Sequence, residues 1–215
     1  MTGGFFVTVD GPSGVGKSTT IAELQRLLAS QGVDALLTTE PPKTALGNFT
    51  RQNASNLRGL TLACMVAAAR YEHVDTTVTP AMNGGRLLIS DRYIASTLVL
   101  QRLDGVPLEF LLDINQHAPT PDLAVILTAG PATIAERIAT AGVTHRFRSD
   151  PDGPSREVRL YGEASAVLEG RGVDVLRVDS STATPSEVAG RIADAITARR
   201  LPSVPSQVLP TSRES

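Results

Sequence analysis

The chain has 215 residues and a formal net charge of -2, which fits one domain with room for a sizeable core. A near-neutral chain without a basic stripe gives no electrostatic support for binding nucleic acid or membranes. The single cysteine, Cys64, excludes a disulfide framework, and no signal peptide or membrane-spanning run is visible, so we expect a cytoplasmic protein.

The first predicted strand leads directly into a glycine-rich loop. Residues 5–9 are apolar, and a helix is predicted after the loop. This order of strand, loop and helix matches the phosphate-binding pattern G-x-x-x-x-G-K-[ST]. The glycines let successive N–H groups point at one anion, and the helix N-terminus adds partial positive charge. The sequence therefore predicts an ATP site made of Gly11, Pro12, Ser13, Gly14, Val15, Gly16, Lys17, Ser18 and Thr19.

Two side chains of this loop have predicted chemical roles. Lys17 is expected to reach the β- and γ-phosphates of ATP, with its stem at the surface of the cleft. Ser18 is expected to hold Mg²⁺ through its hydroxyl. The alternative, a glycine-rich turn of no consequence, would need neither the preceding strand nor the following helix.

The rest of the chain alternates between apolar strands and helices. Strands are predicted at 35–39, 87–89, 123–127 and 173–178. Strands without clean alternation, separated by helices, predict an α/β fold with a parallel sheet covered on both faces. We expect one domain over 1–200, a loop over about 142–154 and a disordered tail over 201–215. Helices are predicted to about 31, on a polar stretch to about 56, and at 57–82, 108–117, 131–141, after 154 and from the capping box at 184–187 to about 199.

Ligands bind at the carboxyl ends of parallel strands, where several reactive side chains fall. Asp91 is predicted to bind Mg²⁺ through water or to orient an acceptor oxygen; the alternative is a cap for the next helix. Arg92 is predicted to hold an acceptor phosphate, with a surface ion pair as the alternative. Arg146 and Arg148 are predicted to close over the transferring phosphoryl group.

Other classes of protein agree less well with these residues. A GTPase would carry Asn-Lys-x-Asp, and neither lysine of the chain, Lys17 or Lys43, lies in that motif. A non-catalytic nucleotide-binding protein has no need for Asp91 and arginines around the phosphate site. His73 and its neighbour are interpreted as a satisfied helix face rather than as catalytic groups. A kinase is the better interpretation.

Several blocks together resemble the thymidylate kinase family of P-loop nucleoside monophosphate kinases. They follow the family's order over roughly residues 5 to 195, and they lie at 10–19, 39–41, 69–74, 91–96, 107–112, 121–123 and 146–148. The resemblance implies a three-layer sandwich with a five-stranded parallel sheet, a homodimer, and transfer of the γ-phosphoryl group of ATP-Mg²⁺ to dTMP.

The resemblance also implies roles for single residues. Arg146 and Arg148 look like the arginines of the family's lid, Arg92 like the arginine on the acceptor phosphate, and Arg70 like the one that contacts the thymine edge. The acceptor site expected in this way, together with a hypothesis for Lys43, comprises Asp10, Glu40, Lys43, Val66, Arg70, Arg92, Ser96, Thr97, Leu100 and Tyr161.

The chain departs from the family pattern on the acceptor side. Ser13 falls where the family has an acid, Val66 where it has an aromatic residue, Leu100 where it has a tyrosine, and Thr39 where it has an arginine. Lys43 is hypothesised to replace that arginine. The acceptor is therefore predicted to be dTMP, with another or modified nucleoside monophosphate, or a deoxynucleoside with a general base at the Glu-Pro pair 40–41, as alternatives.

Overall fold

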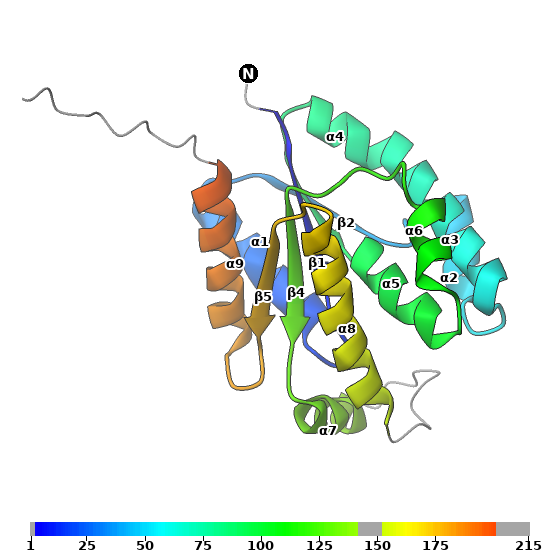
Figure 1. Cartoon of the computed structure of the whole chain (residues 1–215). Helices are drawn as coiled ribbons and strands as arrows, with labels where there is room; N and C mark the ends of the chain where they lie inside the picture. The colour runs from blue at the N-terminus through cyan, green and yellow to red at the C-terminus, as the bar shows by residue number, and fades with distance from the viewer. Residues whose placement is uncertain (1–2, 142–151, 201–215) are drawn as a thin grey trace, which may run out of the picture.

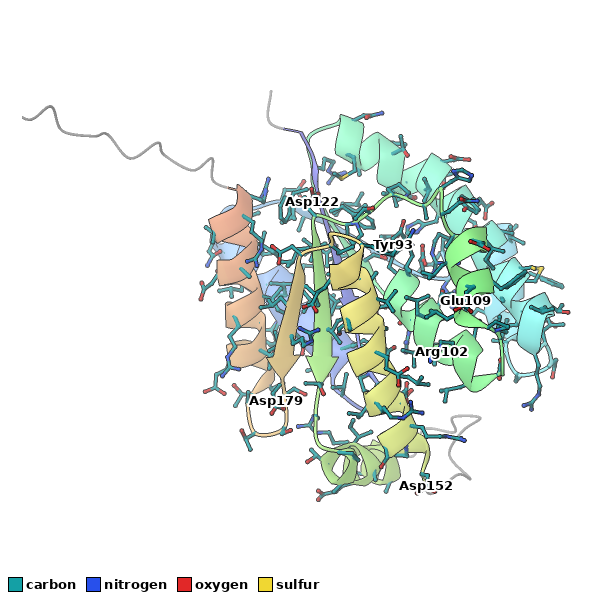
Figure 2. The ribbon with its side chains drawn as sticks, viewed as in Figure 1. Tyr93, Arg102, Glu109, Asp122, Asp152 and Asp179 are labelled. Carbon is teal, nitrogen blue, oxygen red and sulfur yellow. The ribbon has the colours of Figure 1, made fainter. Side chains whose placement is uncertain are left out.

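The computed structural model describes residues 3–141 and 152–200 and places a parallel sheet between two layers of helices (Figure 1). The strand order is β2-β3-β1-β4-β5. Figure 2 labels Asp122 just ahead of β4 and Asp179 at the end of β5, at opposite ends of the sheet. The predicted α/β class with a five-stranded sheet is confirmed. The strands are β1 (Phe5–Asp10), β2 (Ala35–Thr39), β3 (Leu87–Asp91), β4 (Leu123–Thr128) and β5 (Val175–Asp179).

One face of the sheet is covered by α1 (Lys17–Ser30) and α9 (Pro185–Arg200), which pack against each other. The other face is covered by α5 (Ile94–Leu103) and α8 (Gly153–Gly170), with α3 (Gly59–His73) beyond them (Figure 1). The remaining helical segments are α2 (Ala45–Asn53), η1 (Val74–Val78), α4 (Thr79–Asn83), α6 (Leu108–Ile114) and α7 (Pro131–Ala141).

The strand register separates two aspartates that end neighbouring strands. Asp91 pairs with Val9, whose side chain packs in the core under α1 and α9. Asp10 pairs with Ile126, which packs in the core under α5 and α8. Because paired residues of a sheet share a face, Asp91 belongs to the α1 face and Asp10 to the α5 face.

Helix α5 was absent from the sequence-based prediction. Its residues from Ala95 to Val99 are all buried, and only the ends of the helix are partly exposed. A helix buried on nearly every side shows no amphipathic period, so the pattern that identifies helices from sequence is missing here.

Other boundaries differ from the prediction. The helix expected over 57–82 is instead α3, a π-helical segment and α4, and Pro80, which has no N–H to donate, lies in the last of these. The helix expected over 108–117 ends at Ile114, and the last strand is shifted to β5. Most of the loop expected over 142–154 lies outside the described residues, and its last two positions, Gly153 and Pro154, belong to α8.

The capping box ahead of α9 is confirmed. The Thr184 N–H donates to Glu187 Oε2 at 2.7 Å, and the Glu187 N–H donates to Thr184 Oγ1 at 3.3 Å. Within the two described ranges, no helix is both long enough and apolar enough to span a bilayer.

Candidate active site

The glycine-rich loop connects β1 to α1 through left-handed and extended backbone turns. Gly14 and Gly16 have φ angles of 77° and 99°, which side chains other than glycine rarely adopt. A Cβ on Gly14 would lie 2.8 Å from Ile138 Cγ1 of α7, so the loop also packs closely against that helix. The loop and the N-terminus of α1 thus have the strand–loop–helix geometry that a phosphate-binding turn requires.

Lys17 is buried, and this corrects the expectation of a lysine stem at the surface of the cleft. Its side chain is 7% exposed, and Nζ donates to the carbonyl oxygens of Gly11 at 2.6 Å and Pro12 at 2.9 Å. Burial, together with the nearby Arg92 charge, lowers the pKa of Lys17 to about 7. The side chain of Lys17 thus folds back and donates its hydrogen bonds to carbonyl groups of its own loop.

One cavity of about 570 Å³ unites the predicted donor and transfer residues. It is lined by residues of the phosphate loop and α1, by the end of β3 and the residue after it, and by α7. The residues that matter for its chemistry are Ser13, Lys17, Ser18, Asp91, Arg92 and Arg137. The cavity brings hydroxyl, carboxylate and cationic groups to the carboxyl ends of β1 and β3.

Asp91 lies on the α1 face with a carboxylate oxygen that is available for a ligand. Its Oδ1 is buried and has no hydrogen-bond partner among the described residues. Ser18 lines the same cavity. A buried carboxylate oxygen and a hydroxyl are hard oxygen ligands, so the two residues fit Mg²⁺.

The cap of α5 comes from Asp10, and the alternative of a capping role for Asp91 is wrong. Asp10 Oδ1 accepts from the Tyr93 N–H at 3.0 Å, the Ser96 N–H at 2.9 Å and the Ser96 hydroxyl at 2.6 Å. Burial raises the pKa of Asp10, although these hydrogen bonds oppose the shift. Asp10 therefore fixes the start of the helix that carries Ser96 and Thr97.

Arg92 follows β3 in a conformation that is rare for a residue with a side chain. Its φ is 75°, a left-handed value that costs on the order of 1–3 kcal/mol and concentrates at functional sites. Its Nη1 donates to Ser96 Oγ at 3.3 Å, and Ser96 Oγ lies 3.1 Å from the Tyr161 hydroxyl. Arg92, Ser96 and Tyr161, three residues of the predicted acceptor site, are thus brought together.

Arg70 lies in a separate, fully buried network on the same helix layer. Its Nε donates to Glu40 Oε2 at 2.8 Å, and its Nη2 forms an ion pair with the same oxygen at 2.7 Å. Nη2 also donates to Thr97 Oγ1 at 2.8 Å, and Nη1 donates to Asn115 Oδ1 at 2.5 Å. Glu40 is the ion-pair partner of Arg70, so its carboxylate is not a free general base of the kind that a deoxynucleoside kinase would require.

Three predicted acceptor residues have no such connections among the described residues. Val66 on α3 and Leu100 on α5 are half-buried. Lys43 is exposed in the loop ahead of α2, with no hydrogen bond or ion pair to another predicted site residue within the described ranges. Arg146 and Arg148 lie outside the described residues.

The sequence prediction missed two residues that contact the phosphate loop. Glu157 of α8 is 6% exposed, and its Oε1 accepts from the Ser13 N–H at 3.1 Å. Arg137 of α7 donates to the Val15 carbonyl at 3.4 Å and to the Ser180 carbonyl at 2.8 Å. Glu157 lies four residues before Tyr161, so helical spacing from that predicted residue was the only signal available for it.

Comparison with known proteins agrees with this geometry. The thymidylate kinase family model matches residues 9–162. A probable thymidylate kinase of Caldivirga maquilingensis is 34% identical over 151 residues, which covers 68% of this chain and 74% of the relative.

Two further relatives share the resemblance. A probable thymidylate kinase of Pyrococcus abyssi is 39% identical over 132 residues, covering 58% of this chain and 64% of its own length. A thymidylate kinase of Xanthomonas oryzae pv. oryzae is 35% identical over 142 residues, which cover 65% of this chain and 63% of the relative. In both cases the match spans slightly less than two thirds of the relative. With a phosphate loop, a strand-end aspartate and two arginine sites inside the matched region, the chain belongs to the thymidylate kinase family of nucleoside monophosphate kinases.

Proposed function

We propose that this protein transfers the γ-phosphoryl group of ATP to the 5′-phosphate of dTMP, giving dTDP and ADP. The observation that supports this most strongly is the single cavity that joins Lys17 and Ser18 of the phosphate loop to Asp91 and Arg92. The relatives named as thymidylate kinases support dTMP as the acceptor.

On the donor side, the loop N–H groups and Lys17 bind the β- and γ-phosphates. The Lys17 side chain must leave the Gly11 and Pro12 carbonyls to do so, and phosphate charge favours its protonated form. Ser18 and Asp91 would hold Mg²⁺, which neutralises charge on the phosphate oxygens when bound.

On the acceptor side, Arg92 binds the 5′-phosphate and aligns one of its oxygens with the γ-phosphorus. A bond forms from this oxygen to the γ-phosphorus, and the bond from the γ-phosphorus to the bridging oxygen of ADP breaks. Arg92 and Lys17 stabilise the charge on the transferred group, because they act in a buried cavity rather than in water.

The base is selected by one hydrogen-bond acceptor and one hydrogen-bond donor of the protein. Gln101 on α5 has a buried Oε1 without a partner among the described residues, which suits the N3–H of thymine. Among the described residues, Nη1 of Arg70 donates one hydrogen bond, to Asn115, and its second N–H suits thymine O4. Cytosine presents the opposite pattern at both positions, so it would leave these groups unpaired.

The activity test is ADP release by purified protein with ATP, Mg²⁺ and dTMP, dUMP, dCMP or thymidine. We expect dTMP to be the best acceptor, dUMP to lose about fourfold for the missing methyl group, and dCMP to lose far more. Lys17→Ala should retain less than about a tenth of wild-type turnover. Faster turnover of thymidine than of dTMP, or of dCMP than of dUMP, would contradict the proposal.

We also propose that two copies of the chain associate, as the family resemblance implies, and that α2 and α3 form the interface. These helices pack against each other and carry exposed apolar side chains, Phe49 at 52% and Leu60 at 54%. Large apolar side chains at this exposure are typical of surfaces that become covered on association.

A further inference from the structure

His73 is a buried polar side chain that phosphoryl transfer does not itself require. It lies at the end of α3 with 0% exposure. Its Nδ1 is 3.2 Å from Glu40 Oε1, and its Nε2 is 2.7 Å from Thr38 Oγ1. Both ring nitrogens therefore contact residues at the end of β2.

The chemistry of the partners fixes where the protons lie. Glu40 faces the Arg70 guanidinium and is ionised there, so its carboxylate can only accept hydrogen bonds. Nδ1 of His73 must then carry the hydrogen. In the neutral ring Nε2 accepts from the Thr38 hydroxyl, and this completes the hydrogen bonds of the imidazole.

His73 and Arg70 share one carboxylate, each at a different oxygen. Oε1 of Glu40 accepts from His73, and Oε2 accepts from Nε of Arg70 and forms an ion pair with its Nη2. With Oε1 held by the imidazole, the carboxylate cannot rotate, and the guanidinium is held in turn by its hydrogen bond and ion pair to Oε2. Arg70 and His73 are three residues apart on α3 and face the same strand end.

We propose that His73 is a positioning residue that orients Arg70 through Glu40 and thereby sets the affinity for the acceptor base. This inference rests on the proposed function, in which Arg70 meets the base. The competing explanation is that the imidazole only fills space in the core under α3. The two explanations differ in whether the Nδ1 donor matters separately from the ring volume.

Three substitutions separate the donor from the volume. An asparagine amide nitrogen occupies the place of Nδ1, a glutamine amide reaches the place of Nε2, and phenylalanine keeps a ring without polar atoms. His73→Phe and His73→Gln should raise KM for dTMP about tenfold, the scale of one lost hydrogen bond to a charged group. KM for dTMP should stay within about threefold of wild type in His73→Asn and should change less than about twofold in Thr38→Val.

The kinetic readout is the split between the two substrates. KM for ATP and kcat should stay within about twofold of wild type in all four variants, because Arg70 does not touch the phosphate loop. Equal KM values for dTMP in the Asn, Gln and Phe variants, or parallel losses in KM for ATP, would overturn the inference. If another monophosphate proves to be the acceptor, the same comparison is made with that nucleotide.

A second measurement does not depend on the acceptor at all. In protein with ¹⁵N-labelled arginine, the Arg70 Nε–H signal, assigned by its loss in Arg70→Lys, should exchange slowly with water because it is buried on Glu40. Slow exchange should persist in His73→Asn and be lost in His73→Phe. An unchanged signal in His73→Phe overturns the inference even if dTMP is confirmed as the substrate. A lost signal together with no dTMP turnover overturns the proposed function alone.

Discussion

Lys17 is bound by its own loop before any nucleotide arrives. Its ammonium group donates to two carbonyl oxygens. Its burial, together with the nearby Arg92 charge, holds its pKa near 7. The free protein therefore loses the Lys17 proton as the pH rises through about 7, well below the ordinary lysine value of 10.5. ATP phosphates favour the protonated form, so nucleotide binding and proton uptake are linked at this residue.

We expect the affinity for ATP to be constant below pH 7 and to fall above it. Between the pKa of the free protein and the higher pKa of the complex, affinity should drop by up to about tenfold per pH unit. Isothermal titration calorimetry with a non-hydrolysable ATP analogue from pH 6 to 9 measures this dependence. Lys17→Arg keeps its charge throughout, so its affinity should not show that fall, and titration of the nucleotide itself appears equally in both proteins. An equal decrease of affinity with pH in wild type and Lys17→Arg would contradict a Lys17 pKa near 7.

Partners far apart in the sequence are the part of the site that residue patterns could not predict. The phosphate loop, Asp91, Arg92 and Ser96 were identified from local motifs and lie together. Glu157 reaches Ser13 across 144 residues, and nothing in the local sequence of either residue announces that contact. Burial was equally hidden, because the exposure of Lys17 depends on how the whole loop folds around it.

At the scale of elements, α5 is held at its start by a residue from another element. Asp10 ends β1 and caps α5 with one carboxylate oxygen, while its Oδ2 has no partner among the described residues. A raised folded-state pKa means that the contribution of Asp10 to stability is complete below its ordinary value of 3.8 and is lost as the pH rises through the folded value. The cap therefore carries an electrostatic penalty at neutral pH.

Asp10→Asn should remove that penalty and keep the accepting oxygen. We expect its free energy of unfolding, relative to wild type, to increase from pH 4 to pH 7. Asp10→Ala should show the same pH dependence, because it also lacks the titrating group, but should lie about 2 kcal/mol below Asp10→Asn at both values through loss of the cap. Urea denaturation followed by circular dichroism at the two pH values gives the comparison. A stability difference between Asp10→Asn and wild type that is independent of pH would show that the Asp10 charge is not penalised by burial.

Helices with one solvent-exposed face were easier to predict from the sequence than helices buried on all sides. Helices α1 and α9 have exposed faces and clear end signals, and both were predicted close to their observed bounds. Helix α5 has almost no exposed face and was not predicted, because a helix surrounded by protein has no reason to alternate apolar with polar residues.

For the whole molecule, the sequence predicts the layers of the fold better than the arrangement within them. Apolar strands between helices suffice to predict a parallel sheet covered on both sides. The order β2-β3-β1-β4-β5 depends on which strands pair, and strand pairing is set by long-range packing that composition does not record.

The proposed association of two copies is a property of the whole molecule and has its own test. Sedimentation velocity at micromolar concentration should show a dimer for the wild type and a monomer for the double variant Phe49→Ser, Leu60→Ser, since the change removes apolar area from α2 and α3. Asn48→Ser on α2 should leave the dimer intact. A monomeric wild type, or a double variant that stays dimeric with an unchanged melting curve, would contradict this interface.

The opposite facing of Asp10 and Asp91 has a consequence for how this chain can change its length. The two residues end neighbouring, hydrogen-bonded strands, yet Asp10 caps α5 and Asp91 lines the cavity beside the phosphate loop. A single residue inserted or deleted within β1 or β3 would reverse the facing of one aspartate and disconnect one substrate from the chemistry. We therefore expect a random insertion library to yield no active variants with insertions in these two strands. Active variants should carry their insertions in surface connections such as the turn after α1. Whether each aspartate faces α1 or α5 thus depends on whether the number of residues before it in its strand is odd or even.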